Sequence, residues 1–345
     1  MASSSRQQGG IKEVARVAGV SVTTVSHALN GKGRINEETR ERIRRIANDL
    51  GYRPSSMARN LVSRRTGLLA FVLSNTAGVP KGIRDFEYFT QLMLGATTTA
   101  MELGYALVFA PPNQELDREL RVDGAIVVDP TRNDPLLHGL KDKGVPVVST
   151  GRDLGDPGFT DWVDNDHGSG ATSVLDHLQR QGARRIALLT SPTKISYTHD
   201  TETAYREWCA RQQQDVVVRR ARKAPTESEG YTSMTELLSL PDPPDAIYAT
   251  YGRLAFGAAV AATAQGVTVP DQLMIVMTAT ESATANTSPV PLTSINLQPE
   301  QIGRLAAELL VARVEGKEAV PPRPIPTRIV TRTSTRQKTV DAAGA

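Results

Sequence analysis

Arginine and lysine side chains, the groups that neutralise phosphate, are concentrated near the start of the chain. Residues 1–65 contain 13 Lys and Arg against 5 Asp and Glu, whereas the whole chain of 345 residues contains 40 against 37. By difference, residues 66–345 contain 27 against 32 and are net acidic. Because pairing of Lys and Arg with phosphate dominates affinity for DNA, this distribution predicts a nucleic-acid contact in the N-terminal segment. The alternative is that its arginines, Arg40, Arg42, Arg44 and Arg45, form only a solvated helix face.

The serine, cysteine and histidine residues do not occur in sequence motifs typical of catalysis or metal binding. No phosphate-binding loop of the form G-x-x-x-x-G-K-[ST] occurs, and Gly31-Lys32-Gly33 stops short of a dinucleotide-binding fingerprint. Gly168-Ser169-Gly170 is not a nucleophile elbow, and the single cysteine, Cys209, excludes a disulfide framework and a thiolate zinc site. The histidines are scattered, at His27, His138, His167, His177 and His199. We therefore expect no enzyme, with no catalytic residues, no cofactor and no metal.

Three short helices are expected to present the basic segment. Residues 11–18 place apolar side chains at i, i+3, i+4 and i+7, and Gly19 is suited to end that helix. Ser21 is a good N-cap for a second helix, residues 22–30, which is expected to bury Val25 and Leu29. Asn36 is expected to cap a third helix with the apolar stripe Ile43, Ile46, Ala47 and Leu50, closed by Gly51. Two helices joined by a short glycine-containing turn are typical of a helix-turn-helix.

This segment resembles the headpiece of the LacI/GalR family of bacterial transcriptional regulators. The resemblance is carried by IKEVARVAGVSVTTVSHALNG, INEETRERI, GYRP and MARNL, and it extends in weaker form to about residue 335. It implies a helix-turn-helix DNA-binding domain over residues 10–53 and a hinge helix with its linker over 54–65. The polar composition of residues 1–9 separately predicts a disordered leader.

The resemblance assigns DNA contacts position by position. Val22, Thr23 and His27 occupy the recognition-helix positions that face base edges in the major groove. Many members have Arg where this chain has His27, and His lacks the bidentate fork that Arg offers to guanine, which leaves room for a different half-site. The phosphate-contact or capping positions are Ser21, Thr24, Ser26 and Asn30, although Thr24 could instead only pack.

The hinge positions follow in the same way. Leu61 matches the leucine that the family inserts into the minor groove at the operator centre, which unstacks one base step and bends the duplex. Ala58 is small enough to let two hinge helices approach each other in a dimer. The alternative for Leu61 is an ordinary amphipathic position.

The remainder of the chain alternates apolar strands with helices, which predicts α/β lobes with parallel sheets. Expected strands cover residues 67–75, 105–110, 122–130, 145–150, 184–192, 245–250, 273–278 and 327–335. Expected helices cover residues 88–102, 116–121, 167–182, 201–213, 254–265 and 297–315. The resemblance implies a two-lobed core, similar to periplasmic sugar-binding proteins, over residues 66–335, with a tail over 336–345. It places lobe one at 66–160 and 295–320, and lobe two at 161–294 and 321–335.

The effector pocket of the family lies between its lobes, and its polar positions are altered here. Tyr88 and Phe89 match aromatic positions, and Asp164 matches an acidic residue at the cleft. Where sugar-responding members have an Arg, an Asn-Asp pair and an Asp, this chain has Thr201, Tyr251-Gly252 and Ala279-Thr280. Because those lost groups hydrogen-bond sugar hydroxyls, the sequence favours a flatter, less hydroxylated ligand contacted by Tyr88, Phe89 and Tyr251, with Asp164, Thr201 and Ala279 nearby.

The expected function is that of a transcriptional regulator, most simply a repressor, which binds a pseudo-palindromic DNA operator as a homodimer and responds to a small molecule. The alternatives are a ligand-independent DNA-binding regulator with a degenerate pocket and, less consistent with the basic headpiece, a solute-binding protein of a transporter. The polar start lacks the apolar stretch of a secretory signal, and no run reaches the length of a membrane span. A cytoplasmic, nucleoid-associated location with no membrane partner is therefore expected.

Overall fold

The computed structural model describes residues 10–29, 33–52, 65–74, 83–110, 121–192, 194–279, 290–321 and 323–336, without the side chains of residues 83–86 and 279. The chain divides into two compact units, residues 1–67 and residues 68–345. Residues 53–64, which include the expected hinge positions Ala58 and Leu61, lie outside the described residues, and so do Asn30 and most of the helical stretch expected at 116–121.

The first unit contains the three expected helices: α1 (Ile11–Ala18), α2 (Val22–Leu29) and α3 (Glu37–Asp49). Each boundary has a local cause. Gly19 ends α1 in the left-handed region at φ 66°, the Thr24 N–H donates to Ser21 Oγ at 3.0 Å at the start of α2, and the Thr39 N–H donates to Asn36 Oδ1 at 2.8 Å at the start of α3.

One apolar core holds these helices together. Its fully buried members come from all three helices: Val14, Ala15, Ala18, Val25, Ala28, Ile43 and Ala47. The expectation for α2 was wrong in one detail, since Ala28 is buried whereas Leu29 is only partly buried. Val25 and Ala28 lie three residues apart on the same helical face, which leaves the opposite face of α2 free.

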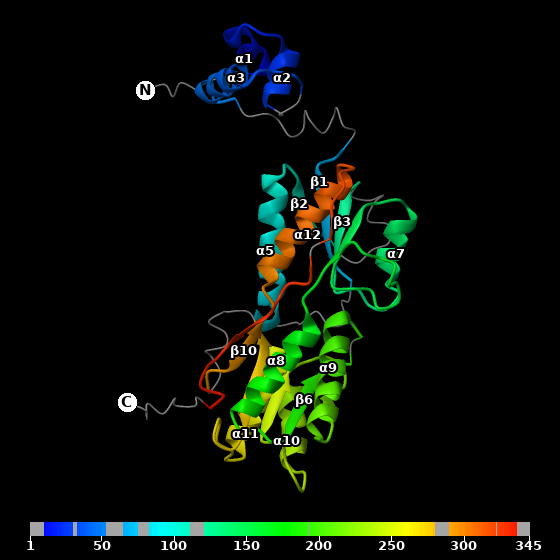
Figure 1. The fold of residues 1–345 in the computed structure, drawn as a ribbon, viewed down its shortest axis with the longest axis vertical. Coiled ribbons are helices and arrows are strands. Elements are labelled where there is room, and N and C mark those ends of the chain that lie inside the picture. Colours follow the sequence, from blue (N-terminus) through cyan, green and yellow to red (C-terminus); the bar gives the residue numbers. More distant parts are fainter. Residues whose placement is uncertain are drawn as a thin grey trace, which may run out of the picture. The chain divides into compact units, whose positions relative to one another are not determined.

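The first lobe of the second unit is built on a parallel sheet. Among the described residues its strand order is β2 (Ala106–Ala110), β1 (Leu68–Leu73), β3 (Gly124–Val128), β4 (Val147–Thr150) and β5 (Trp162–Val163). Helices α5 (Ile83–Glu102) and α12 (Pro299–Val314) cover one face and α7 (Pro135–Asp142) covers the other, which leaves β1 and β3 buried on both faces (Figure 1).

The second lobe repeats this plan. Its described strands are ordered β11 (Arg328–Val330), β10 (Thr293–Asn296), β9 (Met274–Ala279), β8 (Ala246–Ala249), β6 (Ile186–Thr190) and β7 (Val217–Arg220), and all neighbours are parallel except β10 and β11. One face packs against α8 (His167–Arg180) and α9 (Ser196–Gln212), and the other against α10 (Glu227–Leu238) and α11 (Gly252–Ala264) (Figure 1). The predicted α/β core with two parallel sheets is confirmed.

The expected lobe boundaries need correction at two points. Trp162 and Val163 form β5 of the first sheet, although lobe two was expected to begin at residue 161. Thr293–Asn296 forms β10 of the second sheet, although lobe one was expected to resume at residue 295. Helices α7 and α10 and strand β7 were not among the expected elements. Short strands and helices of two or three turns carry too few apolar repeats for periodicity to reveal them.

Asn165 connects the three segments that pass between the lobes. Its Nδ2 donates to the carbonyl oxygens of Leu297 and Ile325, both at 3.1 Å. Two backbone hydrogen bonds reinforce this connection: the Ile325 N–H donates to Asp164 O at 2.9 Å, and the Asp166 N–H donates to Ile325 O at 3.2 Å. The side chain is 3% exposed, so these hydrogen bonds are sheltered from water.

Glycines bring two helix pairs into backbone contact, one pair in each lobe. A Cβ atom on Gly95 of α5 would lie 2.1 Å from Glu300 O of α12, and one on Gly303 of α12 would lie 1.9 Å from Leu92 O. In the second lobe, a Cβ atom on Gly230 of α10 would lie 2.2 Å from Leu254 O, and one on Gly257 of α11 would lie 1.9 Å from Glu227 O. Only glycine fits at these four positions.

Candidate functional site

The free face of α2 is the first candidate contact surface. Val22, Thr23 and His27 are exposed on it, and the Val22 side chain is 41% exposed although it is apolar. These are the three positions expected to face base edges. The buried side of the same helix is anchored by Val25 and Ala28, so α2 is a rigid platform for a row of short side chains.

The flanking polar residues have mixed roles. Ser21 is exposed and its Oγ lies 2.8 Å from Thr24 Oγ1, so Thr24 takes part in the helix cap as well as being half-buried. Ser26 is half-buried. The ring of His27 lies against Gly33, where a Cβ atom would be 3.0 Å from His27 Nδ1 and where φ is +74°. Gly33 therefore lies close to the His27 ring, and a side chain at this position would crowd it.

The arginines of α3 are not simply a solvated face. Arg42 donates to Ala18 O at the end of α1 (3.3 Å), and Arg40 donates to Ala28 O near the end of α2 (3.5 Å). Both cations therefore satisfy carbonyl groups at helix C-termini, where the helix dipole favours positive charge. Part of the positive charge of the headpiece thus stabilises its fold.

A cluster of aromatic side chains occupies the interface between the lobes. This interlobe cluster consists of Ile195, Tyr197, Leu297, Tyr88 and Tyr251. Tyr88 is on α5 of the first lobe, whereas Tyr251 precedes α11 of the second lobe, and the rings of Tyr197 and Tyr251 have their centroids 6.0 Å apart. The expectation that Tyr88 and Tyr251 lie together is consistent with this cluster. Tyr197 was missed, because the helix was expected to begin only at residue 201, whereas α9 begins at Ser196.

Two carboxylates lie beside this cluster in different electrostatic environments. Asp164 is 5% exposed, and His167 Nε2 donates to its Oδ1 at 2.7 Å. Burial opposes ionisation of Asp164, but the nearby His167 and Arg152 hold its pKa below the usual value. Burial and the charge of Asp164 raise the pKa of Asp129 to about 7. Asp129 follows β3 with φ 50°, at the carboxyl end of a parallel strand, where ligands commonly bind. That position could have identified it from the sequence.

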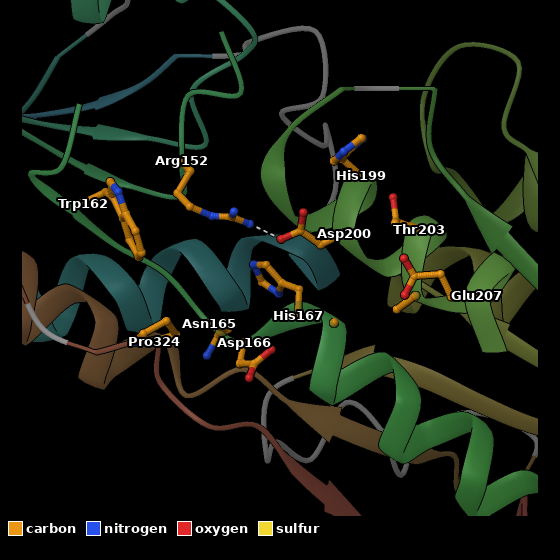
Figure 2. Close-up of a pocket in the computed structure, with 12 residues that line it drawn as sticks. Arg152, Trp162, Asn165, Asp166, His167, His199, Asp200, Thr203, Glu207 and Pro324 are labelled. Carbon is orange, nitrogen blue, oxygen red and sulfur yellow. Dashed lines mark hydrogen bonds and ion pairs between the residues drawn. The ribbon is translucent and has the colours of Figure 1, made fainter. Parts of the chain in front are cut away.

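Arg152 joins the two lobes electrostatically. It follows β4 of the first lobe, its Nε lies 3.3 Å from Asp164 Oδ2, and its guanidinium pairs with Asp200 of α9 in the second lobe (Figure 2). The Arg152 N–H also donates to Ser196 Oγ at 3.2 Å. Neither Arg152 nor Asp200 was predicted, because no local pattern signals an ion pair between residues 48 positions apart.

The other predicted pocket residues are placed differently. Phe89 packs against the core of the first lobe, and its ring centroid lies 5.4 Å from that of Tyr88, so Phe89 contacts Tyr88 on the side of this core. Thr201 is 1% exposed on α9, and Tyr197, one turn earlier, is the residue of that helix that joins the interlobe cluster. Ala279 ends β9, and its side chain lies outside the described residues.

Two family models match the chain. The model for bacterial regulatory proteins of the lacI family matches residues 10–55, and the model for the periplasmic binding protein-like domain matches residues 175–335. These ranges cover the three helices of the first unit and most of the second lobe. Among the described residues, no helix is long and apolar enough to cross a membrane.

Relatives match over almost the whole chain. The HTH-type transcriptional regulator CelR of Thermobifida fusca is 31% identical over 329 residues, which cover 92% of this chain and 95% of that protein. The ribose operon repressor of Halalkalibacterium halodurans is 27% identical over 337 residues, covering 94% and 97%. The solved complex of CelR with cellobiose superimposes with a TM-score of 0.69 at 29% identity, covering 94% of this chain and 99% of that one. A lac repressor dimer bound to operator superimposes with a TM-score of 0.68 at 21% identity, covering 95% of this chain and 99% of that one, and this similarity supports the fold.

Proposed function

Since the chain belongs to the LacI family of bacterial regulatory proteins and is a DNA-binding transcriptional regulator, we propose that it acts as a repressor on a pseudo-palindromic operator. The observation that carries this proposal is the exposed row Val22, Thr23 and His27 on α2, backed by the buried Val25 and Ala28. A helix of this kind reads base edges while its neighbours hold phosphates. Leu61 of the hinge segment would insert at the operator centre, with Ala58 allowing the two hinge helices to approach.

The proposal includes a homodimer, because two-fold symmetry of the protein is mirrored in a palindromic site. Its support is an apolar surface on the first lobe. Leu94 and Met101 of α5 are 54% and 67% exposed, and Phe109 on the edge strand β2 is 59% exposed. Exposed apolar side chains gathered on neighbouring elements are typical of a protein–protein interface.

We further propose that a hydroxylated small molecule acts between the lobes and changes the affinity for DNA. The expectation of a less hydroxylated ligand is not supported, because the similar regulator CelR was solved with cellobiose. The interlobe region of this chain also keeps suitable partners: the carboxylates of Asp129 and Asp164 accept hydroxyl hydrogens, and the rings of Tyr88, Tyr197 and Tyr251 pack against sugar faces. In this proposal, these carboxylates and rings contact the ligand in place of the Arg and Asn-Asp side chains that this chain lacks.

A ligand-independent regulator remains the second candidate. It is favoured by one observation, namely that the aromatic rings of the interlobe cluster pack on one another, with the Tyr197 and Tyr251 centroids 6.0 Å apart. The two candidates differ in one measurable property. An effector-responsive regulator changes its operator affinity when the ligand is added, by about 1–3 kcal/mol in typical cases, whereas a ligand-independent one does not.

The first experiment is selection of bound sequences from random duplex DNA by the purified full chain. We expect enrichment of a palindrome with a flexible pyrimidine–purine step at its centre. His27→Ala should reduce the preference at one base pair of each half-site, whereas His199→Ala, an exposed histidine of the second unit, should leave the selected sequence unchanged. Absence of a palindrome both with and without added cell extract would contradict a sequence-specific operator. Cellobiose and other oligosaccharides, titrated against the selected operator, then test the effector.

A further inference from the structure

A cavity lies at the lobe junction, beside α9. It has a volume of about 450 Å³ and is lined by twelve residues from both lobes, with Arg152, Trp162, His167, Asp200, Thr203 and Glu207 as its principal side chains (Figure 2). Tyr88, Tyr197 and Tyr251 are not among the lining residues. His167 separates the two regions, since its ring packs at 5.0 Å from Tyr197 and also forms part of the cavity wall.

The cavity is built from opposite sides of the lobe junction. Arg152 follows β4 and Trp162 begins β5, and the guanidinium of Arg152 lies 5.8 Å from the centroid of the Trp162 ring. Asp200, Thr203 and Glu207 lie at i, i+3 and i+7 on α9, so they point to the same side of that helix. Figure 2 shows Arg152 and Asp200 directed toward each other across the space between the lobes.

The charges of the cavity wall are predominantly negative. The lining contains three carboxylates, Asp166, Asp200 and Glu207, and one guanidinium, Arg152, together with the imidazoles of His167 and His199. That guanidinium is already shared between Asp200 and Asp164. Burial raises the pKa of Asp200 in spite of the attraction of Arg152, so the available positive charge does not fully compensate this carboxylate. An anion entering the cavity would meet repulsion, whereas a cation would be stabilised.

The wall also contains unused hydrogen-bonding capacity. Asn165 and His167 are 3% and 6% exposed, and Asn165 Oδ1 and His167 Nδ1 lack a hydrogen-bond partner within the part of the chain that the structure describes. An unpaired buried polar atom costs about 1–3 kcal/mol, and it is therefore uncommon away from functional sites. An aromatic platform adjoins these polar groups, because Trp162 is half-buried and its indole ring attracts cations more strongly than the other aromatic side chains do.

We propose that this cavity binds a small organic cation, an amino sugar or an aliphatic amine, at a site separate from the interlobe cluster. The ammonium group would lie between Asp200 and Glu207, on the α9 side of the cavity. Because residues of both lobes contribute, an occupied site would hold the lobes in one arrangement. The proposal does not depend on the nature of the effector, since it concerns different side chains.

The test is a titration of the full chain with four probes: glucosamine, glucose, glucuronate and putrescine. The chain has two tryptophans, Trp162 at the cavity and the fully buried Trp208, so intrinsic fluorescence reports on the site and calorimetry checks it independently. We expect glucosamine and putrescine to change the fluorescence, glucose to bind more weakly and glucuronate not to bind. Trp162→Phe should abolish the fluorescence response.

Charge removal provides the matched comparison. Glu207→Gln keeps the shape of an exposed side chain and should weaken glucosamine about twofold to fivefold, as expected for one exposed ion pair. Glu318→Gln, an exposed carboxylate outside the cavity, should have no effect. Equal binding of glucuronate, no binding of either amine, or affinity that is lost in Tyr251→Ala but unchanged in Glu207→Gln would each overturn the proposal. Only the last outcome points to the interlobe cluster, and none of them affects the proposed DNA-binding function.

Discussion

Removal of the Asn165 amide tests how the lobes are held together. Its Nδ2 donates to Leu297 O and Ile325 O, so one side chain joins all three segments that pass between the lobes. Asn165→Ala deletes both hydrogen bonds. Ile325 O keeps the Asp166 N–H as a donor, whereas Leu297 O loses the Asn165 donor in a buried environment.

The expected loss can be worked from these contacts. Two hydrogen bonds contribute about 1–3 kcal/mol together, and burying a carbonyl group without its donor adds about 1 kcal/mol, which gives a loss of about 2–4 kcal/mol in the free energy of unfolding. For a domain of this size, each kcal/mol lowers the melting temperature by about 2–4 °C. The melting temperature of the two-lobed unit should therefore decrease by about 5–15 °C.

Calorimetry and urea unfolding of the full chain measure this change. Gln212→Ala is the matched control, because it removes an exposed amide–amide hydrogen bond to Gln179 and should change stability by less than about 0.5 kcal/mol. If Asn165→Ala proved as stable as Gln212→Ala, the stabilising role of the Asn165 hydrogen bonds between the crossing segments would be refuted.

Four further predictions follow from other parts of the molecule. The pKa of Asp129 is raised to about 7, so between about pH 4 and pH 7 the folded state keeps a proton that the unfolded state has lost. The free energy of unfolding should therefore decrease as the pH rises through this range. Asp129→Asn should remove this part of the pH dependence, as measured by urea unfolding. His27→Arg should increase affinity about tenfold for half-sites with guanine at the contacted position, and no gain in fluorescence anisotropy would exclude His27 from base contact. Gly303→Ala should destabilise the first lobe by at least about 2 kcal/mol, because its Cβ would overlap Leu92 O; a smaller calorimetric change would mean that α5 and α12 can separate. Tyr251→Ala should weaken any effector of the interlobe cluster by calorimetry without altering operator affinity in the absence of ligand.

The headpiece was predictable from the sequence because its determinants are local. Capping by Ser21 and Asn36, the stops at Gly19 and Gly51 and the apolar stripe of α3 all act within one or two turns. The strands with long apolar runs, such as β1 and β3, were predictable for the same reason.

The interlobe region was only partly predictable because its contacts join distant segments. Arg152 meets Asp200 across the lobes, and Asn165 reaches Leu297 and Ile325, pairs that no periodicity can reveal. Tyr88 and Tyr251 were found through family resemblance, whereas the same resemblance led to Thr201, although Tyr197 of that helix joins the interlobe cluster. The resemblance therefore indicated which polar groups this chain lacks, but not which side chains lie between the lobes instead.

The paired glycines of the two lobes have a mechanical consequence. Where Gly95 and Gly303 bring α5 and α12 into backbone contact, the two helices cannot slide past each other without collision, and Gly230 and Gly257 impose the same restriction on α10 and α11. Each lobe is thus a stiff block in which deformation is costly. A change in the arrangement of the lobes would therefore leave the helix pairs intact and would alter the three crossing segments near Asn165, Leu297 and Ile325.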